Sequence, residues 1–150
     1  MSDNHHPFLE TIRSYYDGCS RSDFETIRAT FTDDVVHYFT HAPVIAGGDT
    51  LANFWVKVAA RFEDHFTVDH GIVQGDECVI EWSLEYRPKP GAERELIRGA
   101  EWYVFREGLI AEIRAYYMNR HDAYPKTNFE LWDYPYEERG YYRLGAAGRD

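Results

Sequence analysis

The sequence predicts a single domain of the α+β class, with helices packed against one face of a curved antiparallel sheet. Two observations predict this fold. Apolar residues recur at helical spacing in the first part of the chain, and alternate with polar residues in the second. The expected order is helix, helix, strand, helix and four strands, and such a separation of helices from strands is typical of α+β domains. The 150 residues suffice for one domain with its own core.

The first predicted helix begins at Pro7, which suits the first turn because its missing N–H would have no partner within the helix. Apolar residues then follow at helical spacing, namely Phe8, Ile12, Tyr15, Tyr16 and Cys19. Gly18 and Ser20 weaken the pattern, so the helix is expected to end near them.

The second and third helices are predicted from their N-terminal signals. Ser22 and Glu25 form a capping-box pattern, and the helix that follows is expected to end at Asp33-Asp34. Its apolar face would consist of Phe24, Ile27 and Phe31. Asp49 or Thr50 can cap the third helix. The apolar stripe of that helix consists of Leu51, Phe54, Trp55, Val58 and Phe62.

Five strands are predicted, at 35–41, 66–73, 78–86, 96–105 and 109–118. Side chains alternate across a strand, so Glu101 shares a face with Ile97, Gly99, Tyr103 and Phe105. That face has no other charge, because Arg98 and the following Arg106 lie on the opposite one. Either both faces of this strand are covered, or the Glu101 carboxylate points into an apolar cavity and forms a chemical site.

Composition excludes several classes of partner. The net charge of −10 argues against nucleic acid and anionic membranes. No apolar run approaches the ~20 residues that span a bilayer, and the N-terminus lacks the basic and apolar regions of a signal peptide. Cys19 and Cys78 form no metal or redox motif. Two reduced thiols in a cytoplasmic protein are expected, and one disulfide is the alternative.

No metal site and no cofactor are expected. His37 and His41 share a strand face but lie about 13 Å apart along an extended strand, too far to bind one ion. The chain has no G-x-S-x-G motif, no glycine-rich phosphate loop and no locally supported Ser/His/Asp triad. Residues 119–150 are rich in Tyr, Pro and charge. They are expected to form an extended C-terminal tail that packs on the single domain of residues 1–150.

Four segments resemble the nuclear transport factor 2-like superfamily, and its SnoaL-like branch in particular. They are Ser22-Asp23-Phe24, Phe31–Val36, Ala46–Thr50 and Phe105–Arg114. The resemblance covers roughly residues 8–118. It implies a cone-shaped sheet wrapped around three helices, an enclosed apolar pocket, and a homodimer. The superfamily includes polyketide cyclases, ketosteroid isomerases, scytalone dehydratases, limonene epoxide hydrolases and non-catalytic binding proteins, so the fold does not fix the chemistry.

Active members of this superfamily carry acid–base residues on the inner face of the sheet. Strand alternation places His37, Glu101 and a set of apolar residues on that face, and Trp55 of the third helix could close the far wall. The expected substrate-binding residues are Phe39, Trp55, Trp82, Leu84, Tyr86, Tyr103, Ala115 and Tyr117. Gly99, Ala111 and Ala115 are small and would leave room for a ligand.

The expected catalytic residues are His37, Glu101, His65 and Tyr15. Tyr15 and Glu101 align with the oxyanion-hole Tyr and the protonated Asp of the ketosteroid isomerases. Their general base aligns near Phe39, so His37 on the same face would have to replace it. His65 lies near the strand-start histidine of the scytalone dehydratases.

The resemblance also removes one chemistry. The inner-face positions that carry the Asp-Arg-Asp arrangement of the limonene epoxide hydrolases are occupied here by Leu84, Trp82 and Ala115. Apolar side chains cannot supply that acid–base set, so epoxide hydrolysis by this route is not expected.

The leading hypothesis is a cofactor-free acid–base enzyme of isomerase, dehydratase or cyclase type. Its substrate would be a hydrophobic small molecule, cyclic or polyketide-like. His37 or His65 would be the base, Tyr15 an auxiliary donor, and Glu101 the acid or oxyanion donor, because burial of a carboxylate disfavours its charged form.

Two other hypotheses stay open at this point. The chain could be a binding protein for an apolar small molecule, with Glu101 as a polar anchor. It could also be an interaction module that uses the outer sheet face as a dimer surface. For the single residues, Glu101 could instead be a surface glutamate or one paired with Arg98 or Arg114, His37 a core histidine and His65 a surface loop histidine.

Overall fold

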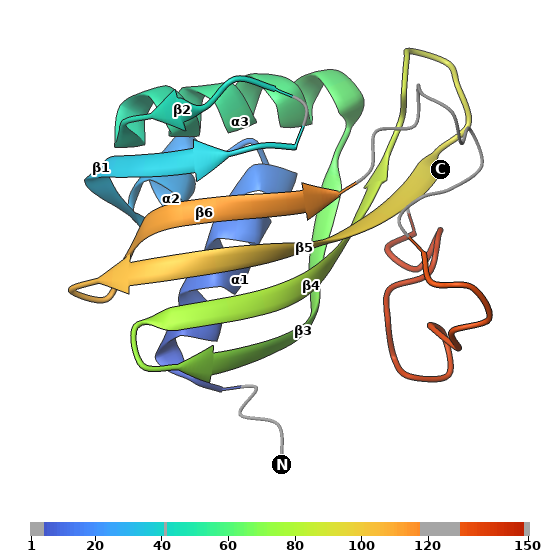
Figure 1. Cartoon of the computed structure of the whole chain (residues 1–150). Coiled ribbons are helices and arrows are strands. Elements are labelled where there is room, and N and C mark those ends of the chain that lie inside the picture. The colour runs from blue at the N-terminus through green and yellow to red at the C-terminus, as the bar shows by residue number, and fades with distance from the viewer. Residues whose placement is uncertain (1–4, 41, 118–129, 149–150) are drawn as a thin grey trace.

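The computed structural model describes residues 5–40, 42–117 and 130–148. Three helices, α1 (Pro7–Ser20), α2 (Phe24–Arg28) and α3 (Gly48–Phe62), lie against one face of a curved sheet (Figure 1). The strands are β1 (Phe31–Tyr38), β2 (Ile45–Ala46), β3 (His65–Gln74), β4 (Glu77–Tyr86), β5 (Glu95–Arg106) and β6 (Leu109–Tyr117). This arrangement confirms the predicted α+β class. The expectations for His41, and for the tail before residue 130, concern residues outside the described part.

The sheet has the strand order β2-β1-β6-β5-β4-β3 and is mixed. From β3 to β6 each strand pairs antiparallel with the next, as predicted, but β1 runs parallel to β6. Alternation shows which residues share a face of a strand. It does not show which strand lies beside it, or in which direction, so the parallel pair and the two-residue strand β2 were not predicted.

The second helix is shorter than predicted, and its cap is a different residue. Asp23 caps α2 by accepting a hydrogen bond from the Thr26 N–H at 3.3 Å, while Ser22 lies in the turn before it with a φ of 53°. The helix ends at Arg28, and the segment from Phe31 onward forms β1. The apolar residue Phe31 satisfies both a helical and a strand pattern, which explains the error.

The third helix has a backbone N-cap at Gly47, whose φ is 99°, and no side-chain cap. Neither Asp49 nor Thr50 plays the predicted capping role. Asp49 instead lies in the first turn, where a negative charge is favourable, and accepts a hydrogen bond from Arg28 Nε at 2.7 Å. None of the helices in the described residues is both long and apolar enough to cross a bilayer.

Helix α1 crosses the inner face of the sheet and is buried on two sides. The Tyr15 ring packs against Phe31 and Trp55, with centroid distances of 5.1 and 6.4 Å. The adjacent Tyr16 ring packs against Phe66 of β3, with a centroid distance of 5.5 Å. Both tyrosines are therefore in the core, although they point in directions about 100° apart around the helix axis.

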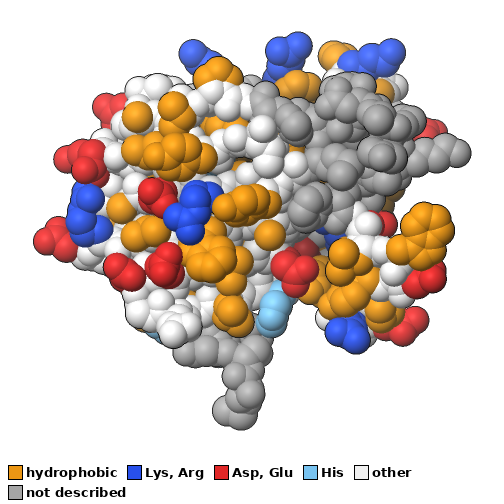
Figure 2. All heavy atoms as spheres, viewed as in Figure 1, with side chains coloured by type: hydrophobic (Ala, Val, Ile, Leu, Met, Phe, Trp, Pro, Cys, Tyr) orange, Lys and Arg blue, Asp and Glu red, His pale blue; other side chains and the backbone are white. Residues whose placement is uncertain are grey.

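The outer face of the sheet has an exposed part and a covered part. Trp102 and Tyr116 are 39% and 49% exposed. Figure 2 shows hydrophobic side chains interspersed with charged ones on this face. Residues 130–148 contact the other part, where Glu85 is fully buried and Arg98 is 5% exposed. Glu85 accepts hydrogen bonds from the Tyr142 hydroxyl and the Gly145 N–H, at 3.0 and 2.6 Å. Arg98 donates to the Tyr142 carbonyl oxygen at 3.0 Å.

Gly99 of β5 makes room for the indole of Trp82, its partner on β4. A Cβ atom at position 99 would lie 2.6 Å from Trp82 Cε2 and 2.7 Å from the Tyr116 carbonyl oxygen. Carbon atoms do not approach so closely, so a side chain here would push the indole away from the strand. The glycine therefore fixes how far Trp82 projects from the inner face.

We predict that Gly99→Ala lowers the free energy of unfolding by about 1–3 kcal/mol, the usual cost of overpacking a well-packed site. Urea denaturation would measure the loss. The double variant with Trp82→Phe should lose less stability than the sum of the losses of the two single variants. The smaller ring vacates the space that the new methyl group needs. Strict additivity would contradict this account of Gly99.

Candidate active site

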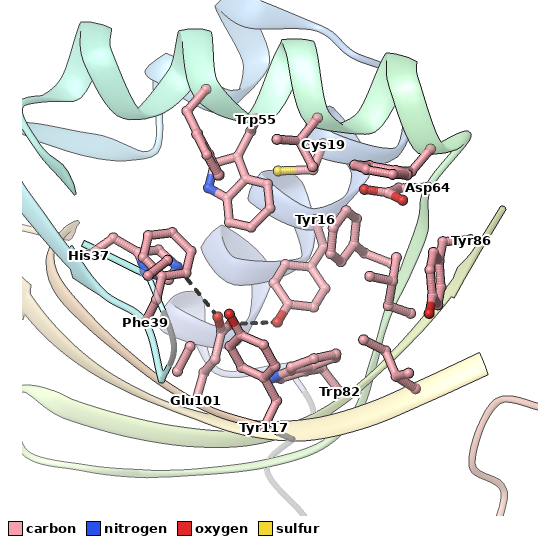
Figure 3. Close-up of a pocket in the computed structure, with 18 of the residues that line it drawn as sticks. Tyr16, Cys19, His37, Phe39, Trp55, Asp64, Trp82, Tyr86, Glu101 and Tyr117 are labelled. Atoms are coloured by element: carbon pink, nitrogen blue, oxygen red, sulfur yellow. Dashed lines mark hydrogen bonds and ion pairs between the residues drawn. The ribbon is translucent and has the colours of Figure 1, made fainter. Parts of the chain in front are cut away.

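A cavity of about 700 Å³ lies between the helices and the inner face of the sheet (Figure 3). Its walls are mainly aromatic and aliphatic. The strands contribute side chains by alternation, and α1 and α3 close the opposite side with Tyr16, Cys19 and Trp55. The volume is within the usual range for a site that binds a small molecule.

Most of the residues predicted for the site meet in this cavity. Its lining includes His37, Glu101 and Tyr15, together with Phe39, Trp55, Trp82, Leu84, Tyr86, Ala115 and Tyr117. Tyr103 and His65 are not part of the lining. Tyr103 is fully buried and contacts Glu101. His65 begins β3, and its ring lies 5.1 Å from that of Tyr142 in the tail, so the structure does not bring it to the cavity.

Glu101 is the polar centre of the cavity and is only 5% exposed. Its Oε1 atom accepts hydrogen bonds from two phenols, that of Tyr16 at 2.5 Å and that of Tyr103. Its Oε2 atom lies 3.6 Å from Nε2 of His37. Neither arginine considered as its partner is near: Arg98 binds the tail, and Arg114 pairs with Glu112. The carboxylate is therefore held by neutral donors and faces a histidine.

The register of three strands brings His37 and Glu101 together. β6 lies between β1 and β5, and it pairs His37 with Ile113 and Glu101 with Ala115. Ala115 has a single methyl group, so the longer side chains on either side can meet above it. The small residue at 115 thus permits the contact between the two ionisable groups.

His37 is fully buried, and its ring stacks on Phe39 with a centroid distance of 4.0 Å and an interplanar angle of 18°. Within the part of the chain that the structure describes, neither ring nitrogen has a hydrogen-bond partner. Buried polar atoms usually have one. A histidine in this state, next to a carboxylate, can exchange a proton with it or with a group placed between them.

Sequence reasoning missed Tyr16, which is the phenol of α1 that reaches Glu101. It treated Tyr16 only as helix core and assigned the donor role to Tyr15. The two residues are neighbours on the apolar face, so helical spacing cannot distinguish them. Asp64 and Cys19 also line the cavity without having been predicted for it.

The donors of the site stay protonated. Burial raises the pKa of Tyr16 well above its ordinary value, and the negative charge and hydrogen bond of Glu101 raise it further. Burial and the Glu101 charge raise the pKa of Tyr103 in the same way. Burial also raises the pKa of the Cys19 thiol, which therefore remains a poor nucleophile.

No metal centre accompanies these groups in the described ranges. Within residues 5–40, 42–117 and 130–148, no group of three or more His, Cys, Asp or Glu side chains is placed to hold an ion. Cys19 and Cys78 are buried and form no disulfide.

A family model described as a SnoaL-like domain matches residues 12–113. A search of curated proteins found no match. Among solved structures, the chain is 31% identical to a protein of unknown function with a cystatin-like fold from Methylobium petroleophilum PM1. The match covers 91% of each chain with a TM-score of 0.67.

Two further structures share the fold at lower identity. A putative polyketide cyclase from Xanthomonas campestris pv. campestris is 18% identical, with 77% of this chain and 93% of that chain covered and a TM-score of 0.67. A Mycobacterium tuberculosis protein in complex with estradiol-17beta-hemisuccinate is 23% identical, with 75% and 94% covered and a TM-score of 0.65.

The raised pKa values of the buried phenols predict a loss of stability in alkaline solution. A phenol that ionises less readily in the folded state stabilises that state fully below about pH 10, the ordinary value for tyrosine. This contribution is lost as the pH rises through the higher folded-state value, since the unfolded chain then binds fewer protons. We expect the free energy of unfolding, measured with urea, to fall progressively above pH 10.

Tyr15→Phe should make this decline shallower, because it removes one buried phenol that does not contact Glu101. Tyr38→Phe is the matched control, since Tyr38 is 46% exposed. Absorbance of phenolate in the folded protein provides the second measurement. Ionisation of all tyrosines in one transition near pH 10 would contradict the prediction.

Proposed function

The chain belongs to the SnoaL-like domain family, and we propose that it is an acid–base enzyme of isomerase, dehydratase or cyclase type. It would act without a cofactor on a hydrophobic, cyclic small molecule bound in the cavity. The observation that carries the proposal is the pair of His37 Nε2 and Glu101 Oε2, 3.6 Å apart in a largely apolar cavity. Isomerisation, dehydration and aldol-type cyclisation all need one group that takes a proton and one that gives it back.

The hydrogen bonds favour Glu101 as the proton acceptor. Both donors at Oε1 are phenols, and hydrogen bonds donated to a carboxylate stabilise its charged form. Oε2 would take a proton from a carbon next to a substrate carbonyl, and His37 would receive or supply a proton for the second half of the reaction. The sequence alone suggested the opposite roles, with a histidine as base and Glu101 as acid.

The cavity supports a ligand of fused-ring size. A volume of about 700 Å³ suits a molecule of two to four rings, and the aromatic walls would pack against its faces. The Mycobacterium tuberculosis protein of the same fold binds a steroid derivative, estradiol-17beta-hemisuccinate. For this chain, binding of such a molecule belongs to the proposal.

We predict that the protein catalyses exchange of the acidic carbon-bound protons of 2-tetralone, a bicyclic ketone, in D₂O. Proton NMR would follow the loss of these signals at neutral pD. Glu101→Gln and His37→Gln should each lower the protein-dependent rate by about 10²- to 10⁴-fold, the usual contribution of a positioned acid or base. Both substitutions keep the size and polarity of the side chain, so the cavity should survive.

His70→Gln and Glu107→Gln are the matched controls, because both residues are exposed on the surface. Both control variants should exchange the protons of the ketone at the wild-type rate. Binding of 2-tetralone, measured by calorimetry, separates the two functional hypotheses. Binding without exchange would overturn the catalytic proposal and leave a carrier of apolar small molecules.

A further inference from the structure

Tyr103 contacts Glu101 without being part of the cavity lining. It shares the inner face of β5 with Glu101, two residues away, and its side chain is fully buried. Its hydroxyl donates a hydrogen bond to Oε1 of Glu101. Because it does not line the cavity, it cannot contact a ligand there. Its effect on any reaction must pass through Glu101.

The two phenols that bind Glu101 occupy the same carboxylate oxygen. Tyr16 approaches Oε1 from α1, and Tyr103 approaches it from β5 itself. Oε2 is left facing His37 on β1. Two donors from different directions fix the rotation of the carboxylate about its last bond, so that Oε2 faces the histidine. Figure 3 shows the contacts of Glu101 with Tyr16 and with His37.

We infer that Tyr103 is a positioning residue, which orients Glu101 and supports its charged form without touching the substrate. This inference rests on the proposed acid–base function, since it names a further residue of the same site. Tyr16 serves the same oxygen but also lines the cavity. The two phenols therefore differ in one respect that can be measured: only Tyr16 can contact the ligand.

The surroundings of Glu101 define what the loss of the Tyr103 hydroxyl would change. Among the residues that the structure describes, the titratable groups around it are Tyr15, Tyr16 and Cys19 of α1, His37 of β1, Tyr103 of β5 and Tyr117 of β6. None of these is an arginine or lysine. Removal of the Tyr103 hydroxyl leaves the Tyr16 hydroxyl as the remaining donor to Oε1, so the rotation of the carboxyl group is less strictly fixed.

The first test measures Glu101 directly and does not depend on turnover. Crystal structures of the wild type and of Tyr103→Phe give the orientation of its carboxyl group. In Tyr103→Phe the carboxyl group should rotate or occupy more than one rotamer, so that Oε2 no longer faces Nε2 of His37. In Tyr38→Phe, the control for loss of an exposed phenol, it should keep the wild-type orientation. An unchanged orientation in Tyr103→Phe would overturn the inference.

The second test separates positioning from binding, with the 2-tetralone exchange reaction. Tyr103→Phe should lower kcat by roughly 10- to 100-fold, the scale expected when a catalytic group is misplaced. KM should stay within about twofold, because Tyr103 has no contact with the ligand. Tyr16→Phe should change both constants. A rise in KM with an unchanged kcat in Tyr103→Phe would contradict the positioning role.

Loss of stability and failure of the proposed function are both distinguishable from failure of this inference. Urea denaturation of Tyr103→Phe shows whether the variant is folded under the conditions of the assays. If the protein catalyses no exchange but the Glu101 carboxyl group changes its orientation in Tyr103→Phe as expected, the proposed function fails and the positioning of Glu101 by Tyr103 holds. If exchange is normal in the wild type and unaffected in Tyr103→Phe, the inference fails and the proposed function holds.

Discussion

The buried carboxylate of Glu101 is the constraint on which the interior of this protein depends. A charged group in an apolar interior is costly unless it is hydrogen-bonded, and here the partners come from three separate elements. Tyr16 fixes the rotation of α1 against the sheet, and Tyr103 reaches the same oxygen from β5. The parallel pairing of β1 with β6 brings His37 to the other oxygen. The arrangement of helix and strands is thus tied to one side chain.

The sequence predicted the location of this group more securely than its partners. Alternation along 96–105 placed Glu101 on an uncharged face, because a period of two is independent of tertiary structure. The partner on α1 depends on the rotation of a helix whose neighbouring residues Tyr15 and Tyr16 are both buried. The family resemblance selected Tyr15, and the hydrogen bond belongs to Tyr16. His65 shows a related limit of prediction from sequence, because a shift of one residue along a strand moves a side chain to the opposite face of the sheet.

The strands β4 and β5 serve two environments at once. Leu84 and Tyr86 line the cavity, while Glu85 between them is buried on the outer face by the C-terminal segment. Such a polar outer face looks solvent-exposed in the sequence, because the tail covers it largely with polar groups, among them the Gly145 N–H, the Tyr142 hydroxyl and the Glu130 carboxylate. Residues 130–148 therefore explain why charged residues on this part of the sheet are buried. They also bind β4 and β5, which contribute to the cavity wall.

The choice of neutral donors around Glu101 bears on what the group can do. An arginine in hydrogen-bond distance would add a full positive charge and oppose protonation of the carboxylate strongly. A phenol supports the charged form more weakly, since it adds no net charge and a hydrogen bond to a charged group contributes only about 1.5–3 kcal/mol. Among the described residues that line the cavity, none is a lysine or arginine. Glu101 is therefore held by neutral donors and not by an arginine or lysine of the described lining. In the proposed reaction the group must both accept and release a proton, and a permanent ion pair with an arginine or lysine would oppose its protonation.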